Sequence, residues 1–80
     1  MKYPKLVEFG KNLRIARLVK GYSMEKLAMI ANLNSTHIGK IERAEMAPTL
    51  PTILALLEAL DVDFNSLVTY KRTTNKLYVH

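Results

Sequence analysis

A short turn separates two short stretches of helical periodicity near the middle of the chain, and this spacing strongly restricts the fold. The first stretch runs from Met24 to Ile30 and the second from Ser35 to Arg43. Asn32 tolerates a positive φ, so it can end the first helix in a tight turn. Asn34 can then cap the second helix through its side chain. Two short helices joined by such a turn form a helix-turn-helix pattern.

The residues before this pattern predict one further helix, over roughly Leu6 to Val19, because Phe9, Leu13 and Ala16 recur at helical spacing. Gly21 follows as a C-terminal stop signal.

After the pattern, Thr49 can cap a fourth helix and Asp63 a short fifth one. No strict alternation of apolar and polar residues occurs before the C-terminal tail. The predicted fold class is therefore all-α, a compact five-helix domain over residues 1–68. The tail, residues 69–80, is predicted to be a short strand or an extended segment. Two interpretations stay open: a strand that pairs across a dimer or binds a partner, and plain disorder.

Charge is distributed unevenly along the 80 residues. Residues 1–43 carry nine Lys or Arg and three Asp or Glu, whereas residues 44–70 carry four acidic residues and no Lys or Arg. A basic first half suits a polyanionic partner. The N-terminus has no apolar signal segment and no apolar run could span a bilayer, so a cytoplasmic protein with no membrane association is expected.

Neither catalysis nor a bound metal or cofactor is expected. The chain has no Cys, no Gly-rich phosphate loop and no His, Asp and Glu cluster with ligand spacing.

Several segments, in register, resemble the Cro/cI-type (XRE-like) helix-turn-helix regulators. The resemblance covers about residues 9 to 68 and rests on LRIAR (13–17), GYSMEKLA (21–28), NLNSTHIGKIERA (32–44), PTL (48–50) and LDVDFNSL (60–67). It implies a lambda-repressor-like domain in which the helix from Ser35 to Arg43 lies in the DNA major groove. It also implies a homodimer that binds a palindromic operator and usually represses transcription.

With Ile38 and Ile41 facing the core, the other side of this helix is expected to contact DNA. Short polar groups and a lysine can reach base edges. By resemblance, the base-reading positions are Ser35, Thr36, Gly39 and Lys40. Two interpretations of Gly39 stay open: a side chain there would hold the helix away from the groove, or the glycine is simply tolerated on an exposed face.

Phosphate contacts are predicted around this helix. A helix N-terminus with free N–H groups suits a phosphate. The resemblance places Met24 where the family commonly has Gln, so Met24 either contacts DNA or packs. The predicted phosphate-contacting residues are Ser23, Met24, His37, Arg43 and Thr49.

Two further groups of residues are predicted to be structural. Arg17 and Glu42 are expected to form an ion pair that fixes the DNA-contacting helix against the first helix. A dimer interface is predicted at Phe64, Leu67, Val68 and Tyr70, with the alternative that the first three complete the core of the monomer.

Ala44 stands where the family usually has Gly. If that position needs a positive φ, Ala is strained there. The helix is therefore expected to continue slightly further or to end differently.

The function predicted from these features is a sequence-specific DNA-binding transcriptional regulator, in the first place a homodimeric repressor. Two alternatives stay open. One is an antitoxin whose tail holds a toxin; the other is a restriction-modification controller or activator that contacts RNA polymerase.

Overall fold

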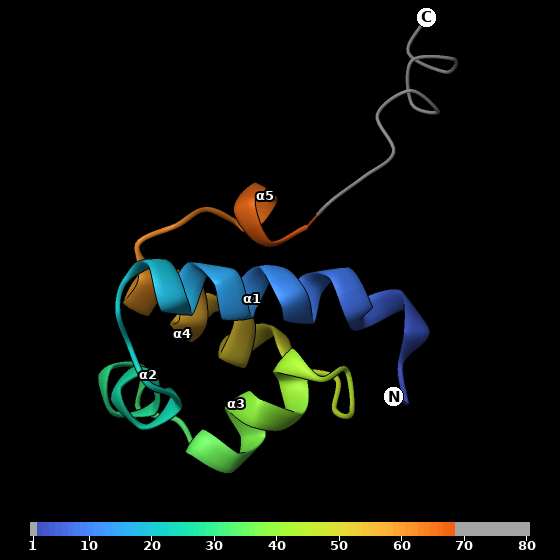
Figure 1. The fold of residues 1–80 in the computed structure, drawn as a ribbon, viewed down its shortest axis with the longest axis horizontal. Helices are drawn as coiled ribbons and strands as arrows, with labels where there is room; N and C mark the ends of the chain where they lie inside the picture. The colour runs from blue at the N-terminus through green and yellow to red at the C-terminus, as the bar shows by residue number, and fades with distance from the viewer. Residues whose placement is uncertain (1, 69–80) are drawn as a thin grey trace, which may run out of the picture.

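The structure is a computed structural model, and it describes residues 2–68; residues 1 and 69–80 lie outside the described part. The described chain is all-α, as predicted, and consists of a short 3-10 turn and five helices (Figure 1). The elements are η1 (Pro4–Leu6), α1 (Val7–Val19), α2 (Met24–Ala31), α3 (Ser35–Glu42), α4 (Leu50–Leu60) and α5 (Phe64–Leu67). The strand predicted for the tail falls on residues that are not described.

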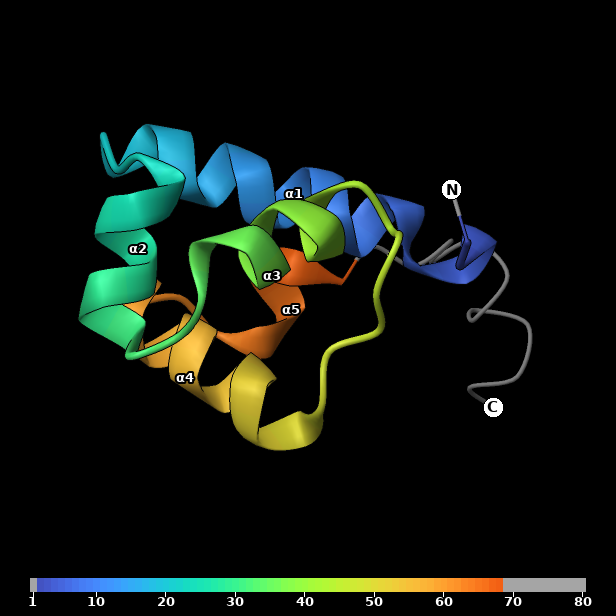
Figure 2. The ribbon, with the colours of Figure 1, turned by 90° about the horizontal axis from the view of Figure 1, so that it is seen from below.

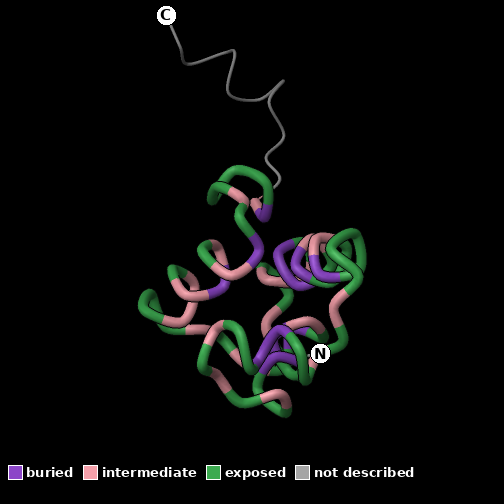
Figure 3. Tube along the Cα trace, turned by 90° about the vertical axis from the view of Figure 1, so that its left-hand side faces the viewer, coloured by how far each residue is buried: buried purple, intermediate pink, exposed green. Residues whose placement is uncertain are grey.

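One apolar core joins all five helices. In Figure 1, α5 lies on one side of α1, while α2 and α3 lie on the other side. The buried segments of the helices face this centre (Figure 3). Each fully buried Leu or Ile side chain stabilises the fold by roughly 1.5–3 kcal/mol. The core residues are Phe9, Leu13, Leu27, Ala28, Ile38, Ile41, Leu56, Leu60 and Leu67.

Side-chain caps fix the starts of four helices, and at three of them, Asn34, Thr49 and Asp63, the sequence predicted the capping residue. The side chains of Ser23, Asn34, Thr49 and Asp63 each accept a hydrogen bond from a backbone N–H in the first turn. These N–H groups have no partner within the helix, so each cap contributes roughly 1 kcal/mol.

The ends of α1 to α4 share one geometry. Each helix is followed by a residue with positive φ: Gly21, Asn32, Ala44 and Asp61, with φ of 77°, 58°, 57° and 56°. The N–H of the next residue donates to the carbonyl five positions back in all four cases; after α3, Glu45 N donates to Lys40 O at 2.8 Å. This is the Schellman arrangement, which satisfies the last carbonyls of a helix.

The expectation that α3 would run on past Ala44 is therefore wrong. Ala44 adopts the left-handed conformation that the family's Gly would adopt, and its methyl group is buried. Its carbonyl accepts hydrogen bonds from the backbone N–H groups of Lys2 and Tyr3, at 3.0 and 2.9 Å. These bonds and the burial hold the residue in a conformation that is unfavourable for Ala.

Ala44→Gly is expected to leave the free energy of unfolding within about 1 kcal/mol of the parent value, on the stabilising side. Relief of left-handed strain contributes roughly 1–2 kcal/mol, and loss of the buried methyl costs about 0.8 kcal/mol. Urea denaturation measures the difference. The matched control is Ala28→Gly, in the buried interior of α2. There the loss of the buried methyl group and the lower helix propensity of Gly both destabilise the protein. Equal losses for the two variants would contradict the argument.

Gly10 lies where α1 crosses the end of α3. A Cβ atom built on Gly10 would lie 2.5 Å from the carbonyl oxygen of Glu42 and 2.7 Å from that of Ile41. No side chain fits there without moving one backbone away from the other, so Gly10 sets the distance between α1 and α3.

Candidate nucleic-acid interface

The turn between α2 and α3 is held by short local hydrogen bonds. Asn32 ends α2 in the left-handed conformation, and Leu33 N donates to Ala28 O at 2.8 Å. Leu33 then packs against the core. Asn34 Oδ1 accepts from Thr36 N at 2.7 Å and from His37 N at 3.3 Å, which starts α3. Residues within the turn therefore fix the direction in which α3 leaves it.

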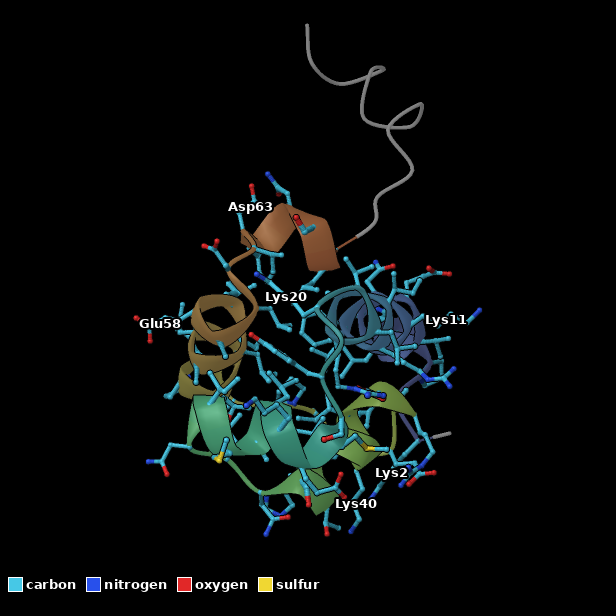
Figure 4. All side chains as sticks on the ribbon, turned by 60° about the vertical axis from the view of Figure 1, so that its left-hand side comes forward. Lys2, Lys11, Lys20, Lys40, Glu58 and Asp63 are labelled. Carbon is cyan, nitrogen blue, oxygen red and sulfur yellow. The ribbon has the colours of Figure 1, made fainter. Side chains whose placement is uncertain are left out.

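Two buried isoleucines decide which side of α3 faces outward. Ile38 is fully buried and Ile41 almost so. Thr36 and Lys40 are exposed and Ser35 is half-buried, as expected for the outer face, by which we mean the side of α3 opposite the two isoleucines. Figure 2 shows α3 in front of the other helices, and Figure 4 shows Lys40 projecting away from the core. The structure thus places Ser35, Thr36 and Lys40 where a partner can contact them.

Gly39 is buried although it belongs to the outer face, so the interpretation that it is simply tolerated on an exposed face is wrong. That a side chain there would hold the helix away from the groove stays a prediction. A Cβ at this position would lie 3.1 Å from Arg43 Nη1 and 3.2 Å from Met24 Sδ. The side chain of Arg43, at the end of α3, and that of Met24, at the start of α2, thus cover Gly39. Gly39 is not an open backbone surface in the free protein, and Met24 packs.

The other predicted phosphate-contacting residues lie around α3. His37 is exposed. Ser23 and Thr49 are exposed and their hydroxyl oxygens cap α2 and α4. Arg43 is exposed and pairs with Glu45, with Nε 3.1 Å from Oε2. Their contacts with DNA stay a prediction.

A buried ion pair connects α1 with the end of α3. Arg17 Nε donates to Glu42 Oε2 at 2.7 Å and Arg17 Nη2 to Glu42 Oε1 at 3.1 Å, while Nη1 donates to Tyr22 O at 2.9 Å. The side chains are 7% and 5% exposed. The hydrogen bond with Glu42 raises the pKa of Arg17 above its usual value. The bidentate geometry holds α3 at a fixed orientation.

The predicted dimer residues have different environments. Leu67 is fully buried in the core of the single chain, so its assignment to a dimer interface is wrong. Val68 is half-buried against the core, and Phe64 is 45% exposed rather than inward. Tyr70 lies outside the described residues.

Sequence reasoning missed two features of this region. The Lys2 and Tyr3 N–H groups bind the exit of α3 at Ala44, and Lys2 lies at the same side of the molecule as Lys40 (Figure 4). Glu45 pairs with Arg43, and the sequence signal was an acidic residue two positions after a basic one.

Within residues 2–68, no helix is long and apolar enough to cross a membrane, and no His, Asp and Glu side chains gather as a metal site.

Comparison with known proteins decides the family. A family model described as helix-turn-helix matches residues 13–67, which is more than half of the chain. The chain belongs to this helix-turn-helix family. It is a DNA-binding transcriptional regulator, as predicted, and α2, the turn and α3 are its helix-turn-helix.

Relatives of this helix-turn-helix protein include a control protein and a restriction-modification controller protein. The control protein C.SmaI of Serratia marcescens is 36% identical over 67 residues, which cover 84% of this chain and 80% of that protein. The crystal structure of the restriction-modification controller protein C.AhdI from Aeromonas hydrophila is similar with a TM-score of 0.79 and 39% identity, covering 82% of this chain and 100% of that one. The hypothetical transcription factor NHTF from Neisseria is similar with a TM-score of 0.76 and 29% identity, over 91% and 84% of the two chains.

Proposed function

We propose that this protein binds a palindromic operator as a homodimer, with α3 of each copy in the major groove, and so controls transcription. The observation that carries the proposal is the orientation of α3. Its inner side is anchored by Ile38 and Ile41, its start is capped by Asn34, and Thr36 and Lys40 project from its outer face. A helix supported from behind with short polar groups at its N-terminal end suits entry into the groove.

The outer face supplies the chemistry for reading base edges. The hydroxyls of Ser35 and Thr36 can donate or accept, and the Thr methyl can lie against a thymine methyl. The ammonium group of Lys40 can reach guanine O6 and N7, and a good pairing of this kind discriminates by roughly 1–3 kcal/mol. Five residues at the start of α2, along α3 and at the start of α4 are proposed to contact phosphates, Met24 through its backbone N–H because its side chain packs: Ser23, Met24, His37, Arg43 and Thr49.

The distribution of charged residues supports the placement of DNA against α3. Figure 4 shows Lys2 and Lys40 on the side of α3, whereas Glu58 and Asp63 lie on the side of α4 and α5. A polyanion is attracted to the former side, whereas the latter side carries the two carboxylates together with Lys20 and attracts it less (Figure 4). We therefore place the DNA against α3.

Lys40→Ala is expected to lower the preference for the operator over random DNA by roughly tenfold, because it removes one base contact worth 1–3 kcal/mol. The operator is first selected by the purified protein from a random DNA pool, and binding is then measured at several salt concentrations. Lys11→Ala is the control, since Lys11 is equally exposed but lies on α1. An unchanged preference in Lys40→Ala would show that the base-reading assignment is wrong.

A second copy is proposed to dock beside α5. Phe64 and Val68 line an open, mainly apolar groove of about 430 Å³, whose other walls are formed by η1, the start of α1, the loop before α4, and α4 itself. Exposed aromatic side chains beside an apolar groove are typical of interfaces. In a two-fold dimer the Phe64 side chain of each copy would enter the groove of the other. Such a dimer would present two α3 helices to half-sites about 34 Å apart.

Phe64→Ser is expected to weaken the dimer by about 30-fold or more, because truncating an aromatic side chain at the centre of an interface costs roughly 2 kcal/mol or more. Sedimentation equilibrium measures the dissociation constant. Leu54→Ser, on α4, is the control, since Leu54 is similarly exposed but does not line the groove. The same dissociation constant in both variants would rule out the groove as the interface.

A restriction-modification controller is the role that the comparisons favour. C.SmaI and C.AhdI are controllers by name and cover most of this chain. We propose that this protein likewise controls the genes of a restriction-modification system in the cytoplasm. The selected operator should then lie upstream of the protein's own gene and of neighbouring endonuclease or methyltransferase genes. A reporter gene would show whether the protein represses transcription or activates it through RNA polymerase.

The antitoxin alternative stays a prediction, because the tail that motivates it is not described; co-purification with a toxin would support it.

A further inference from the structure

The head of Arg43 occupies the space that a side chain at residue 39 would occupy. Side chains on a helix lean toward its N-terminus, so the Arg43 head lies over the preceding turn. Its Nη1 atom is 3.1 Å and its Cζ atom 3.8 Å from the position of a Cβ on Gly39. Met24 Sδ limits the same space at 3.2 Å. The guanidinium group is therefore held at the middle of the outer face and not at the end of the helix.

Glu45 orients the guanidinium group in this position. Arg43 Nε donates to Glu45 Oε2 at 3.1 Å and Arg43 Nη2 donates to Oε1 at 3.3 Å. Two parallel hydrogen bonds orient the plane of the group, in a pair that lies at the surface with its side chains 55% and 43% exposed. The backbone of Glu45 is itself fixed, since its N–H closes the Schellman arrangement at the end of α3. The hydrogen bond from Arg43 lowers the pKa of Glu45.

The donors that remain have the geometry of a base contact. An arginine has five N–H donors, and Glu45 takes one on Nε and one on Nη2. Both N–H groups of Nη1 and the second one of Nη2 remain, and these form the end of the fork. An arginine fork pairs in a bidentate manner with guanine O6 and N7 in the major groove.

We infer that Arg43 is a base-reading residue for a guanine, that Glu45 positions its guanidinium group, and that Gly39 provides the space for it. This inference rests on the proposed binding of α3 in the major groove. It assigns Arg43 a role beyond the phosphate contact predicted from the sequence. It also explains why a helix position on the outer face carries a glycine.

If Glu45 had a different role, as a competitor of DNA phosphates, the effect of removing it on DNA binding would be the opposite. If the carboxylate only competed with DNA phosphates for Arg43, its removal would strengthen binding to every DNA to a similar extent. If it positions Arg43 for one base, its removal lowers the preference at one base pair of the operator.

Three substitutions test the inference with the full chain and the selected operator, together with a panel of operators that carry every single base-pair change. Gly39→Ala places a methyl group 3.1 Å from Nη1, so the guanidinium group must shift by a few tenths of an ångström. Arg43→Lys removes the fork but keeps the charge, and Glu45→Gln keeps the shape but removes the carboxylate. All three are expected to reduce discrimination at the same G·C pair in each half-site, about tenfold for Arg43→Lys. Arg14→Lys, at an exposed position of α1, is the control.

The outcomes separate the inference from the proposal on which it rests. Thermal unfolding checks that every variant is folded. Equal weakening at all base pairs, with a smaller salt dependence, would make Arg43 a phosphate contact and overturn the inference, while the proposed function would stand. Unchanged discrimination in Gly39→Ala would overturn the role of Gly39. A parent protein that selects no preferred sequence would overturn the proposed function itself.

Discussion

Gly10→Ala is expected to lower the free energy of unfolding by about 3 kcal/mol. The new methyl group would lie 2.5 Å from the carbonyl oxygen of Glu42, and this atom belongs to the backbone, so it cannot rotate away. Overpacking of this kind costs roughly 1–3 kcal/mol, and the upper end applies because α1 and α3 must separate. Urea denaturation at neutral pH measures the loss.

Gly39→Ala is the matched control, because it makes the same substitution inside a helix. There the methyl group meets the ends of two flexible side chains, Met24 and Arg43, which can move. Alanine also favours the helix by about 1 kcal/mol. The control should therefore be neutral or stabilising. A similar loss in both variants would mean that contact with the carbonyl groups is not the cause.

Removing Arg17 from its pair with Glu42 is expected to cost about 3–5 kcal/mol, because a buried carboxylate then loses its partner. The suitable variant is Arg17→Met, which keeps the apolar part of the side chain. The stability of domains is typically 0.05–0.15 kcal/mol per residue, so this loss would unfold a large fraction of the protein. Denaturation followed by circular dichroism gives the value, and DNA binding should weaken in proportion to the unfolded fraction.

A double-mutant cycle separates the pair from the packing around it. Arg17→Met combined with Glu42→Leu replaces both charges with apolar groups, and this change should cost less than either single variant alone. If the two single losses simply add in the double variant, the residues do not act as a pair and the argument is wrong.

Local signals explain why the helices could be predicted from the sequence. An N-cap is a Ser, Thr, Asn or Asp that accepts a hydrogen bond from a backbone N–H two or three positions later, and Ser23, Asn34 and Thr49 are such residues. The periodicity of the isoleucines in α3 predicted which side faces outward. Both signals depend on residues that are close in the sequence, so they are visible without the structure.

The incorrect predictions, and the features that the sequence did not reveal, depend on residues that are distant in the sequence or on competing contacts. The close approach of α1 to α3 at Gly10 involves residues more than thirty positions apart. Ala44 takes the left-handed conformation because bonds from the N-terminus and burial of its methyl outweigh its local preference. Leu67 was assigned to the dimer interface because an apolar residue near the chain's end suits a core or an interface equally well. Only the packing of α5 on α1 decided between them.

The support of α3 has a consequence for how this regulator can diverge. Its capping residue, its two isoleucines and Glu42 hold the helix, whereas Thr36 and Lys40 are exposed on the opposite side. Substitutions at exposed helix positions usually change stability by less than about 0.5 kcal/mol. A descendant can therefore acquire a new operator through successive single substitutions, each of which leaves a folded protein. Two such regulators in one cell could in this way become independent of each other while they keep the same architecture.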